Sequence, residues 1–225
     1  AAFTIDNTSY SIISQGYNVS DVPGPQTKNI IVIDDTKPVG AVNQPNQNFI
    51  NALPTLTGTA TDPGRSLLPP AELAGIVSPD AKIYIRLKQI SGALNGKYWD
   101  GAAFDNLPAS PGAADILAPF SAGATVIWST APAAGPGLRD GVSYRIVVIP
   151  QDKAGNNDFT GLDEDSMGHF DVTYDTSTPS STIGNITPGQ VLRSLASIDG
   201  TAADPPGGNS PGDKSDLDKV QIQIY

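Results

Sequence analysis

Residues 140–156 read DGVSYRIVVIPQDKAGN, and this stretch decides the fold. Asp140-Gly141 favours a turn, because glycine adopts positive φ without steric cost and aspartate accepts hydrogen bonds from the backbone that follows it. From Tyr144 onward the apolar side chains alternate, which is typical of a β-strand. The KAGN sequence at the end favours a second turn. The stretch therefore predicts a strand over residues 143–150, bounded by turns.

The composition of the whole chain favours many short strands. Of its 225 residues, 39% are hydrophobic and 16% are charged, and it holds 23 glycines and 20 prolines. Frequent glycine and proline suit strands joined by turns better than helices. No run of about 18 apolar residues occurs, so we predict that this segment is soluble and does not insert into a membrane.

The formal charge of -10 limits the partners. Phosphates would be repelled by such a surface, so we predict no binding to nucleic acid or to anionic membranes, whereas divalent cations are favoured. The chain has no cysteine. This excludes disulfides, thiolate nucleophiles and cysteine-based zinc or iron–sulfur sites.

Parts of the opening stretch, and other segments, occur twice in the chain. The segment 6–12 aligns with 140–146, 32–34 with 173–175, 53–63 with 195–205, and 82–85 with 219–222. The offsets are 134, 141, 142 and 137 residues, a drift expected where loops change length and strands do not. The sequence therefore predicts a repeat of about 140 residues.

This repeat divides the chain into three parts. We predict the closing strands of one unit at 1–34, a complete unit at 35–175, and the opening strands of a third unit at 176–225. The two end segments have too few strands for a sandwich of their own. They are predicted to pair through edge strands and junctions with neighbouring repeats or with copies of the same chain.

The complete unit has the strand number of a simple immunoglobulin-like sandwich, which is seven. In the segment 82–90 apolar residues alternate with polar ones, which predicts one buried face and one face in water for Arg86 and Lys88. Two insertions, 64–80 and 106–124, enlarge the unit. The predicted strands are 40–42, 55–61, 82–90, 97–99, 125–129, 143–150 and 170–174.

Tyr144, a few residues past a turn in a late strand, matches the tyrosine corner of such sandwiches, in which the phenol hydroxyl bonds to backbone upstream. Further motifs are DTSTP at 175–179, GTAAD at 200–204, KYWDG at 97–101 and DKAGN at 152–156. Together they resemble the bacterial immunoglobulin-like repeats of very large secreted and cell-surface proteins, which carry a DTTxP junction, a GTAxD strand, a YWxG hairpin and a DxAGN turn. The resemblance covers the whole chain. Its departures are Asn7 in the first turn and the two insertions.

The resemblance implies an all-β fold of tandem immunoglobulin-like β-sandwiches, placed outside the cell or on its surface. Such repeats serve as filaments, stalks and adhesin shafts, which implies a structural role. The alternatives are a glycan- or protein-binding surface module and a spacer beside a secreted enzyme. The single histidine, His169, is not accompanied by a Gly-x-Ser-x-Gly nucleophile motif, and we predict that the chain is not an enzyme.

Acidic residues concentrate near the end of the complete unit and at the unit junctions. Calcium takes six to eight oxygen ligands from carboxylates, amide side chains and backbone carbonyls, so these residues are candidate calcium ligands. A cation at a junction would stiffen the hinge between neighbouring units. The alternative is a solvated acidic surface. The candidates are Asp34, Asp35, Asp152, Asp158, Asp163, Asp165 and Asp175.

The two tryptophans are candidates for different roles. Trp128 lies in an alternating segment and is predicted to fill the core, because an aromatic side chain buries roughly 150–250 Å². Trp99 is a candidate ligand-binding residue that would stack on a sugar, and a position in the core is its alternative.

Overall fold

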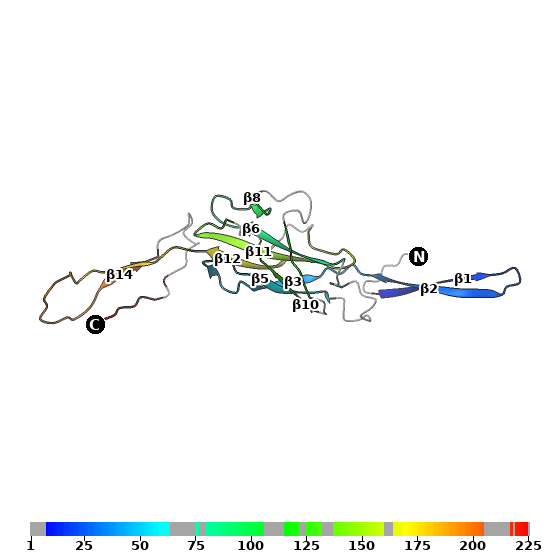
Figure 1. The fold of residues 1–225 in the computed structure, drawn as a ribbon, viewed down its shortest axis with the longest axis horizontal. Helices are drawn as coiled ribbons and strands as arrows, with labels where there is room; N and C mark the ends of the chain where they lie inside the picture. Colours follow the sequence, from blue (N-terminus) through cyan, green and yellow to red (C-terminus); the bar gives the residue numbers. More distant parts are fainter. Residues whose placement is uncertain are drawn as a thin grey trace.

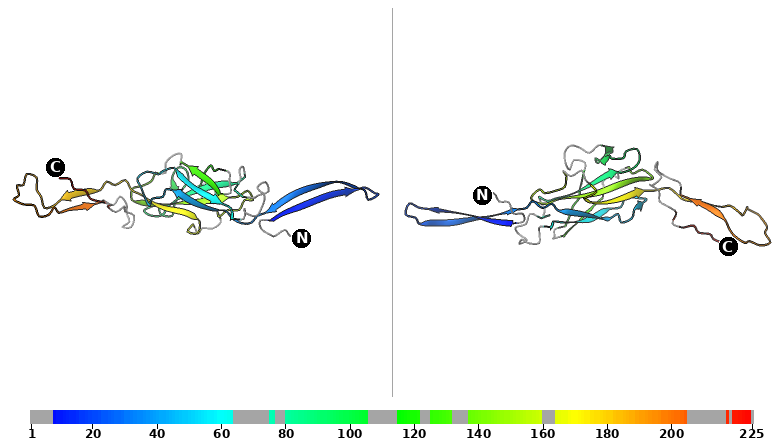
Figure 2. Two further views of the ribbon diagram at one scale, coloured as in Figure 1. Left: turned by 90° about the horizontal axis from the view of Figure 1, so that it is seen from below. Right: turned by 180° about the vertical axis from the view of Figure 1, so that it is seen from behind.

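The computed structural model describes residues 8–63, 75–76, 80–105, 115–121, 125–131, 137–159, 164–204, 217 and 219–224. About half of the chain, 48%, forms β-strands, and these residues include no α-helix. The described part of the chain is therefore all-β, as predicted. None of the described residues belongs to a helix long and apolar enough to span a membrane. A two-stranded hairpin lies at each end of an elongated molecule, with a larger two-sheet body between them (Figures 1 and 2).

The body consists of one small and one large sheet. The small sheet has the order β10-β5-β3, with β10 Thr125–Thr130, β5 Leu56–Thr61 and β3 Val39–Gln44, all antiparallel. The large sheet has the order β4-β12-β11-β6-β7-β8, and β9 also pairs with β6. Its strands are β4 Phe49–Ile50, β12 Gly168–Tyr174, β11 Val142–Gln151, β6 Lys82–Gln89, β7 Tyr98–Trp99, β8 Phe104–Asp105 and β9 Ile116–Leu117.

All seven strands predicted for the middle of the chain are present, as β3, β5, β6, β7, β10, β11 and β12. Each predicted end lies within about two residues of the observed one, the usual uncertainty of strand boundaries. The two-residue strands β4, β8 and β9 were not predicted, because two residues are too few to show alternation. Most of the insertions 64–80 and 106–124 lies outside the described residues.

The main core lies between the two sheets. Leu56 and Trp128 from the small sheet meet Ile85 and Tyr144 from the large one, and all four side chains are fully buried. The Tyr144 hydroxyl accepts a hydrogen bond from the Arg139 backbone N–H at 2.8 Å, as the tyrosine-corner prediction requires. Burial raises the pKa of Tyr144, which keeps its hydroxyl protonated.

The outer face of β6 differs from the prediction. Arg86 was expected in water, yet its side chain is only 3% exposed. The segment that contains Asp115 and the loop that contains Glu164 cover this face, and both carboxylates are buried with it. A second, smaller core of Val147, Ile149 and Met167 packs there with Tyr84 and Phe159. The sheet is therefore buried on both faces along β6 and β11.

The two end hairpins reproduce the strand pairing of the body. In β1 (Thr8–Tyr17) and β2 (Pro23–Ile33), Thr8 pairs with Ile33, as Val142 pairs with Tyr174 between β11 and β12. The offsets between these pairs are those of the sequence alignment, 134 and 141 residues. The hairpin β1–β2 thus has the register of β11–β12.

The same holds at the other end. In β13 (Ser180–Ile183) and β14 (Gly200–Ala203), Ile183 pairs with Gly200, as Val42 pairs with Gly58 between β3 and β5. The segments at equivalent positions of the repeat therefore also share their pairing register. A one-residue slip would have moved every side chain to the opposite face.

Candidate metal centre

Three aspartates meet where the first hairpin joins the body. Asp34 directly follows β2, Asp62 follows β5, and Asp152 follows β11. One carboxylate oxygen from each lies within 4.8 Å of the others. Asp62 and Asp152 are buried, with 6% and 1% exposure, and Asp34 is half-buried. We call Asp34, Asp62 and Asp152 the junction triad.

The turn after β11 holds this triad in place. The Asn156 backbone N–H donates to Asp152 Oδ1 at 2.8 Å, and the Asn156 side-chain amide donates to Asp152 Oδ2 at 2.9 Å. The same amide donates to the backbone carbonyl of Asp34 at 2.9 Å. The DKAGN turn therefore ties the end of β11 to the linker that follows β2.

A second contact crosses the same junction. Lys37 Nζ lies 2.7 Å from Asp158 Oδ1 in an exposed ion pair. Within the linker, the Thr36 N–H donates to Asp34 Oδ1 at 3.1 Å. The linker between β2 and β3 is thus held at several points.

The chemistry of the junction triad suits a hard divalent cation. Three carboxylates converge here in a small, largely buried volume, and carboxylate oxygens are ligands that hard cations prefer. A calcium ion binds oxygens at about 2.3–2.6 Å, so two of its ligands can lie at most about 5 Å apart. The oxygen separations of 4.8 Å or less satisfy this limit. The triad therefore fits calcium by both donor type and spacing.

Sequence reasoning found two members of the triad and missed the third. Asp34 and Asp152 were candidate ligands, and the structure brings them together. Asp62 was aligned with Asp204 in the repeat but was not proposed as a ligand. The sequence feature that could have identified Asp62 as a ligand is its position directly after a predicted strand, in the GTATD sequence. Asp35 is exposed beside the triad.

Two other candidates, Asp158 and Asp165, pair with side-chain cations and are not part of the triad. The Arg145 guanidinium hydrogen-bonds Asp171 at 2.8 and 2.9 Å and also pairs with Asp165. These bonds raise the pKa of Arg145, and the bond from Arg145 lowers the pKa of Asp165. Asp158 pairs with Lys37, as described above. These carboxylates are neutralised by side-chain cations.

Two candidates remain. Asp163 lies outside the described residues. Asp175 lies at the opposite end of the body, where its N–H donates to the Ile50 carbonyl at 2.9 Å and its Oδ1 accepts from the Ser177 N–H at 2.8 Å. The acidic residues predicted as calcium ligands therefore lie at several separate places in the structure.

The aromatic candidates lie in the core. Trp128 is fully buried, as predicted, and its Nε1 donates to the Thr59 carbonyl at 3.3 Å. Trp99 is 6% exposed and packs on Phe104, with 5.6 Å between ring centroids. A buried indole has no free face for a sugar, so the stacking role predicted for Trp99 has no support in its position.

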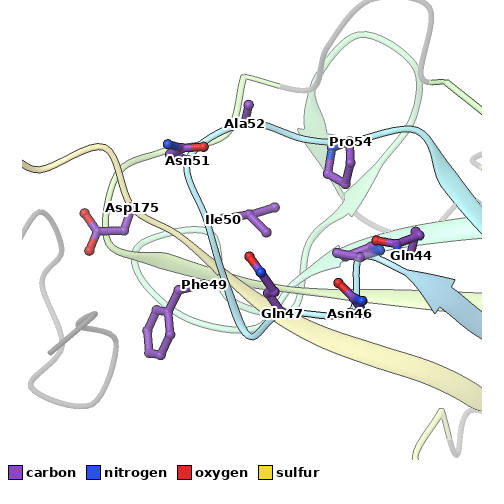
Figure 3. Close-up of a pocket in the computed structure, with 10 residues that line it drawn as sticks. Gln44, Asn46, Gln47, Phe49, Ile50, Asn51, Ala52, Pro54 and Asp175 are labelled. Atoms are coloured by element: carbon purple, nitrogen blue, oxygen red, sulfur yellow. The ribbon is translucent and has the colours of Figure 1, made fainter. Parts of the chain in front are cut away.

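A hollow of about 500 Å³ lies beside Asp175 (Figure 3). Its lining includes the amides of Gln44, Asn46, Gln47 and Asn51, and Phe49, which is exposed. Side-chain amides can hydrogen-bond the hydroxyl groups of a ligand, and here they lie next to an exposed aromatic ring. This combination is typical of sites that bind polar ligands. Sequence reasoning did not single out this segment, because its residues are ordinary for a loop.

Comparison of the chain with protein-family models, with curated proteins and with solved structures gives no match.

Proposed function

We propose that this chain is a structural, non-enzymatic segment of an extracellular or cell-surface filament, stalk or adhesin shaft built from immunoglobulin-like repeats. The observation that carries the proposal is the shared register: β1–β2 pairs like β11–β12, and β13–β14 pairs like β3–β5. Repeated pairing at a sequence offset of about 140 residues is typical of a tandem array.

The strand order of the body supports the immunoglobulin-like assignment. In chain order β3, β5, β6, β10, β11 and β12 stand for strands A, B, C, E, F and G of that fold. The small sheet then contains A, B and E, and the large one contains C, F and G. A constant-type sandwich divides these six strands in the same way, but its first sheet also contains a strand D, which the described three-stranded sheet lacks. The tyrosine corner at Tyr144 also falls on strand F, as in that fold.

A load-bearing role is testable by pulling the chain from its two ends. If the body from Val39 to Tyr174 unfolds as one unit, a single rupture should release on the order of 450 Å of chain, at about 3.3 Å per residue. Extension without a discrete rupture would argue against a load-bearing unit.

We also propose that the junction triad binds calcium and thereby stiffens the hinge between units. The support is the convergence of Asp34, Asp62 and Asp152 at the linker. The next junction has aspartates at the aligned positions, Asp175 and Asp204. Calcium would bind carboxylate oxygens from all three residues of the triad. An array would then carry one such site at each junction.

The hollow beside Asp175 favours a second candidate function, the binding of a glycan. Its amides and the exposed Phe49 are the observation that supports it. Phe49→Ala should then abolish binding on a glycan array, whereas Tyr17→Ala, which removes an exposed ring elsewhere, should not. Equal binding by both variants and the parent chain would argue against this role.

A further inference from the structure

The two linkers that join the body to its neighbouring hairpins are both attached to the ends of one strand. The entry linker, residues 34–38, connects β2 to β3, and the exit linker, residues 175–179, connects β12 to β13. Neither linker adjoins β11 in the chain. Each nevertheless contacts one of the two turns that bound β11. The two ends of β11 are therefore connected to the two linkers by non-covalent contacts.

The turn after β11 holds the entry linker. The Asn156 side-chain amide donates to the backbone carbonyl of Asp34 at 2.9 Å, and the Asp158 carboxylate pairs with Lys37 at 2.7 Å. The turn itself is closed, because the Asp152 N–H donates to the Asn156 carbonyl at 3.2 Å and the Asn156 N–H donates back to the Asp152 carboxylate at 2.8 Å. We call the contacts of Asn156 and Asp158 with the linker the entry tether.

The turn before β11 holds the exit linker. Asp140 Oδ1 accepts a hydrogen bond from the Thr176 N–H at 2.6 Å, and Asp140 Oδ2 accepts one from the Ser177 hydroxyl at 2.8 Å. The neighbouring Gly141 N–H donates to the carbonyl of Tyr174, at the end of β12, at 2.7 Å. We call the contacts of Asp140 with Thr176 and Ser177 the exit tether.

β11 is itself paired along both edges. Its residues 142–148 pair with β12, and its residues 144–151 pair with β6. Side chains on both of its faces are fully buried, with Ile146 in the main core and Val147 in the second core. In contrast, β3, where the chain enters the body, stands at the edge of the small sheet. β5 is its only strand partner among the described strands.

The direction of a force decides how such pairs resist it. Hydrogen bonds between antiparallel strands run across the strands, so a force along a strand loads many of them at once. A force that lifts one end of an edge strand breaks them one after another. β11 lies along the long axis of the molecule (Figure 1). Tension delivered to its two ends therefore loads its pairs together, whereas tension delivered to β3 peels that strand from its sheet.

We propose that the two tethers make β11 the strand that transmits tension from one linker to the other. A pull on the entry linker reaches the end of β11 through Asn156, and a pull on the exit linker reaches its start through Asp140. β3 and β12 are then loaded fully only after a tether breaks. The inference rests on the structural role proposed above, and it names the contacts that give the unit its resistance to force.

The sequence repeats the residues of the exit tether. Asp6 aligns with Asp140, and Thr36 aligns with Ser177, at the offsets of 134 and 141 residues found for the surrounding segments. Asp6 lies outside the described residues. A carboxylate before the tyrosine-containing strand and a hydroxyl in the linker thus occur at both junctions in the sequence. Such recurrence is expected of a contact that each unit of an array uses.

The test pulls the full chain in two ways. In the first, force is applied at the two chain ends and passes through the entry linker. In the second, force is applied at Val39→Cys and at the C-terminal end, so that it bypasses the entry linker. The chain has no cysteine of its own, and Val39 is 54% exposed at the start of β3, so this attachment point is unique and accessible.

The rate at which the body ruptures at a given force should depend on where the force is applied. We expect rupture roughly tenfold faster from Val39→Cys than from the chain ends, because the hydrogen bond and ion pair of the entry tether are bypassed. Asn156→Ala should remove most of this difference, since it breaks the bond to the linker. Tyr144→Phe is the matched control, because it removes one hydrogen bond inside the body and should preserve the difference.

The exit tether has a control of its own. Asp140→Ala should speed rupture from the chain ends roughly tenfold, because two hydrogen bonds to the exit linker are lost. Asp100→Ala removes a turn carboxylate that also accepts two backbone bonds, from Ala102 and Ala103, but that contacts neither linker through them. It should leave the rupture rate within about twofold of the parent.

Two results would overturn the inference and leave the proposed function standing. One is a discrete rupture of the parent chain at the same rate in both ways of pulling. The other is an early extension of about 17 Å, the length of the five linker residues 34–38, followed by rupture of the body as from Val39→Cys. That step would mean that the entry tether breaks before β11 is loaded. Loss of any discrete rupture would instead count against the proposed function itself.

Discussion

At the scale of single residues, Tyr144 connects the core to the turn before β11. We predict that Tyr144→Phe lowers the free energy of unfolding by about 1–2 kcal/mol, because the bond from the Arg139 N–H to the hydroxyl of the buried tyrosine is lost while the ring remains. Urea unfolding followed by tryptophan fluorescence measures this change. Tyr17→Phe removes an exposed hydroxyl and should change stability by less than about 0.5 kcal/mol. Equal effects of the two substitutions would contradict the role given to Tyr144.

Gly58 is the second residue whose identity the packing dictates. A Cβ there would lie 2.0 Å from the Ala41 carbonyl oxygen and 2.3 Å from the Trp128 ring. We expect Gly58→Ala to destabilise the fold by about 1–3 kcal/mol or more, since backbone and a buried indole cannot both move aside. Gly137→Ala is the control, because nothing lies within 4 Å of its added Cβ. The melting temperatures of the two variants should differ clearly.

At the scale of elements, the buried pair of Arg86 and Asp115 fastens the segment around β9 to β6. Its two hydrogen bonds measure 2.8 and 3.0 Å. Asp115→Asn should destabilise the body by about 3–5 kcal/mol, because it leaves the arginine charge buried without its main partner. Denaturant unfolding gives the value.

The matched control for this pair is Asp158→Asn, which breaks the exposed ion pair with Lys37. Exposed pairs contribute about 0–1 kcal/mol, because water screens both charges. A small effect of Asp115→Asn, comparable to that of the control, would mean that Arg86 finds another partner when Asp115 is changed.

We predict that the contact between Asp140, which precedes β11, and the linker from β12 to β13 depends on pH. The Thr176 N–H donates to Asp140 at 2.6 Å and the Ser177 hydroxyl donates at 2.8 Å. These bonds, that from Thr176 first, lower the pKa of Asp140 below its usual 3.8. Because the folded pKa is the lower one, Asp140 stabilises the fold above pH 3.8, and this contribution disappears as the pH falls through the folded pKa.

The corresponding measurement compares Asp140→Ala with the parent chain across this range. The variant should be less stable at neutral pH, and the difference should shrink in acid. Asp80→Ala, at an exposed position, is the control. A difference that stays constant down to the lowest pH would exclude the charge of Asp140 as its cause.

At the scale of the whole molecule, the proposal that calcium at the junction triad stiffens the hinge between the first hairpin and the body can be tested in solution. Calcium at about one hundred times its dissociation constant should stabilise the chain by about 2.7 kcal/mol if it binds only the folded state. Thermal unfolding in calcium and in chelator measures this difference. Small-angle scattering should show a narrower range of maximum dimensions when calcium is present.

Asp152→Asn should remove both effects, because it takes one charge from the triad. Asp165→Asn, at a carboxylate held by Arg145 away from the triad, should leave them unchanged. Equal calcium responses of the two variants would mean that any calcium effect arises elsewhere in the chain.

Local pattern was sufficient to predict the seven longer strands of the body and the alignment of the repeated segments, but not the two-residue strands β4, β8 and β9. The DGVSYRIVVIPQDKAGN stretch contains its own turns, its own alternation and the tyrosine whose hydroxyl bonds to Arg139. These properties depend on neighbours in the chain, which a sequence displays directly.

The tertiary structure decided what covers each surface and which charges meet. Arg86 alternates like a residue in water, yet it is buried because a distant segment brings Asp115 over it. The acidic residues near the end of the body look alike in sequence, but Arg145 neutralises some of them, while Asp152 meets Asp34 and Asp62. Burial and charge pairing depend on contacts between segments far apart in the chain, so only the folded chain determines them.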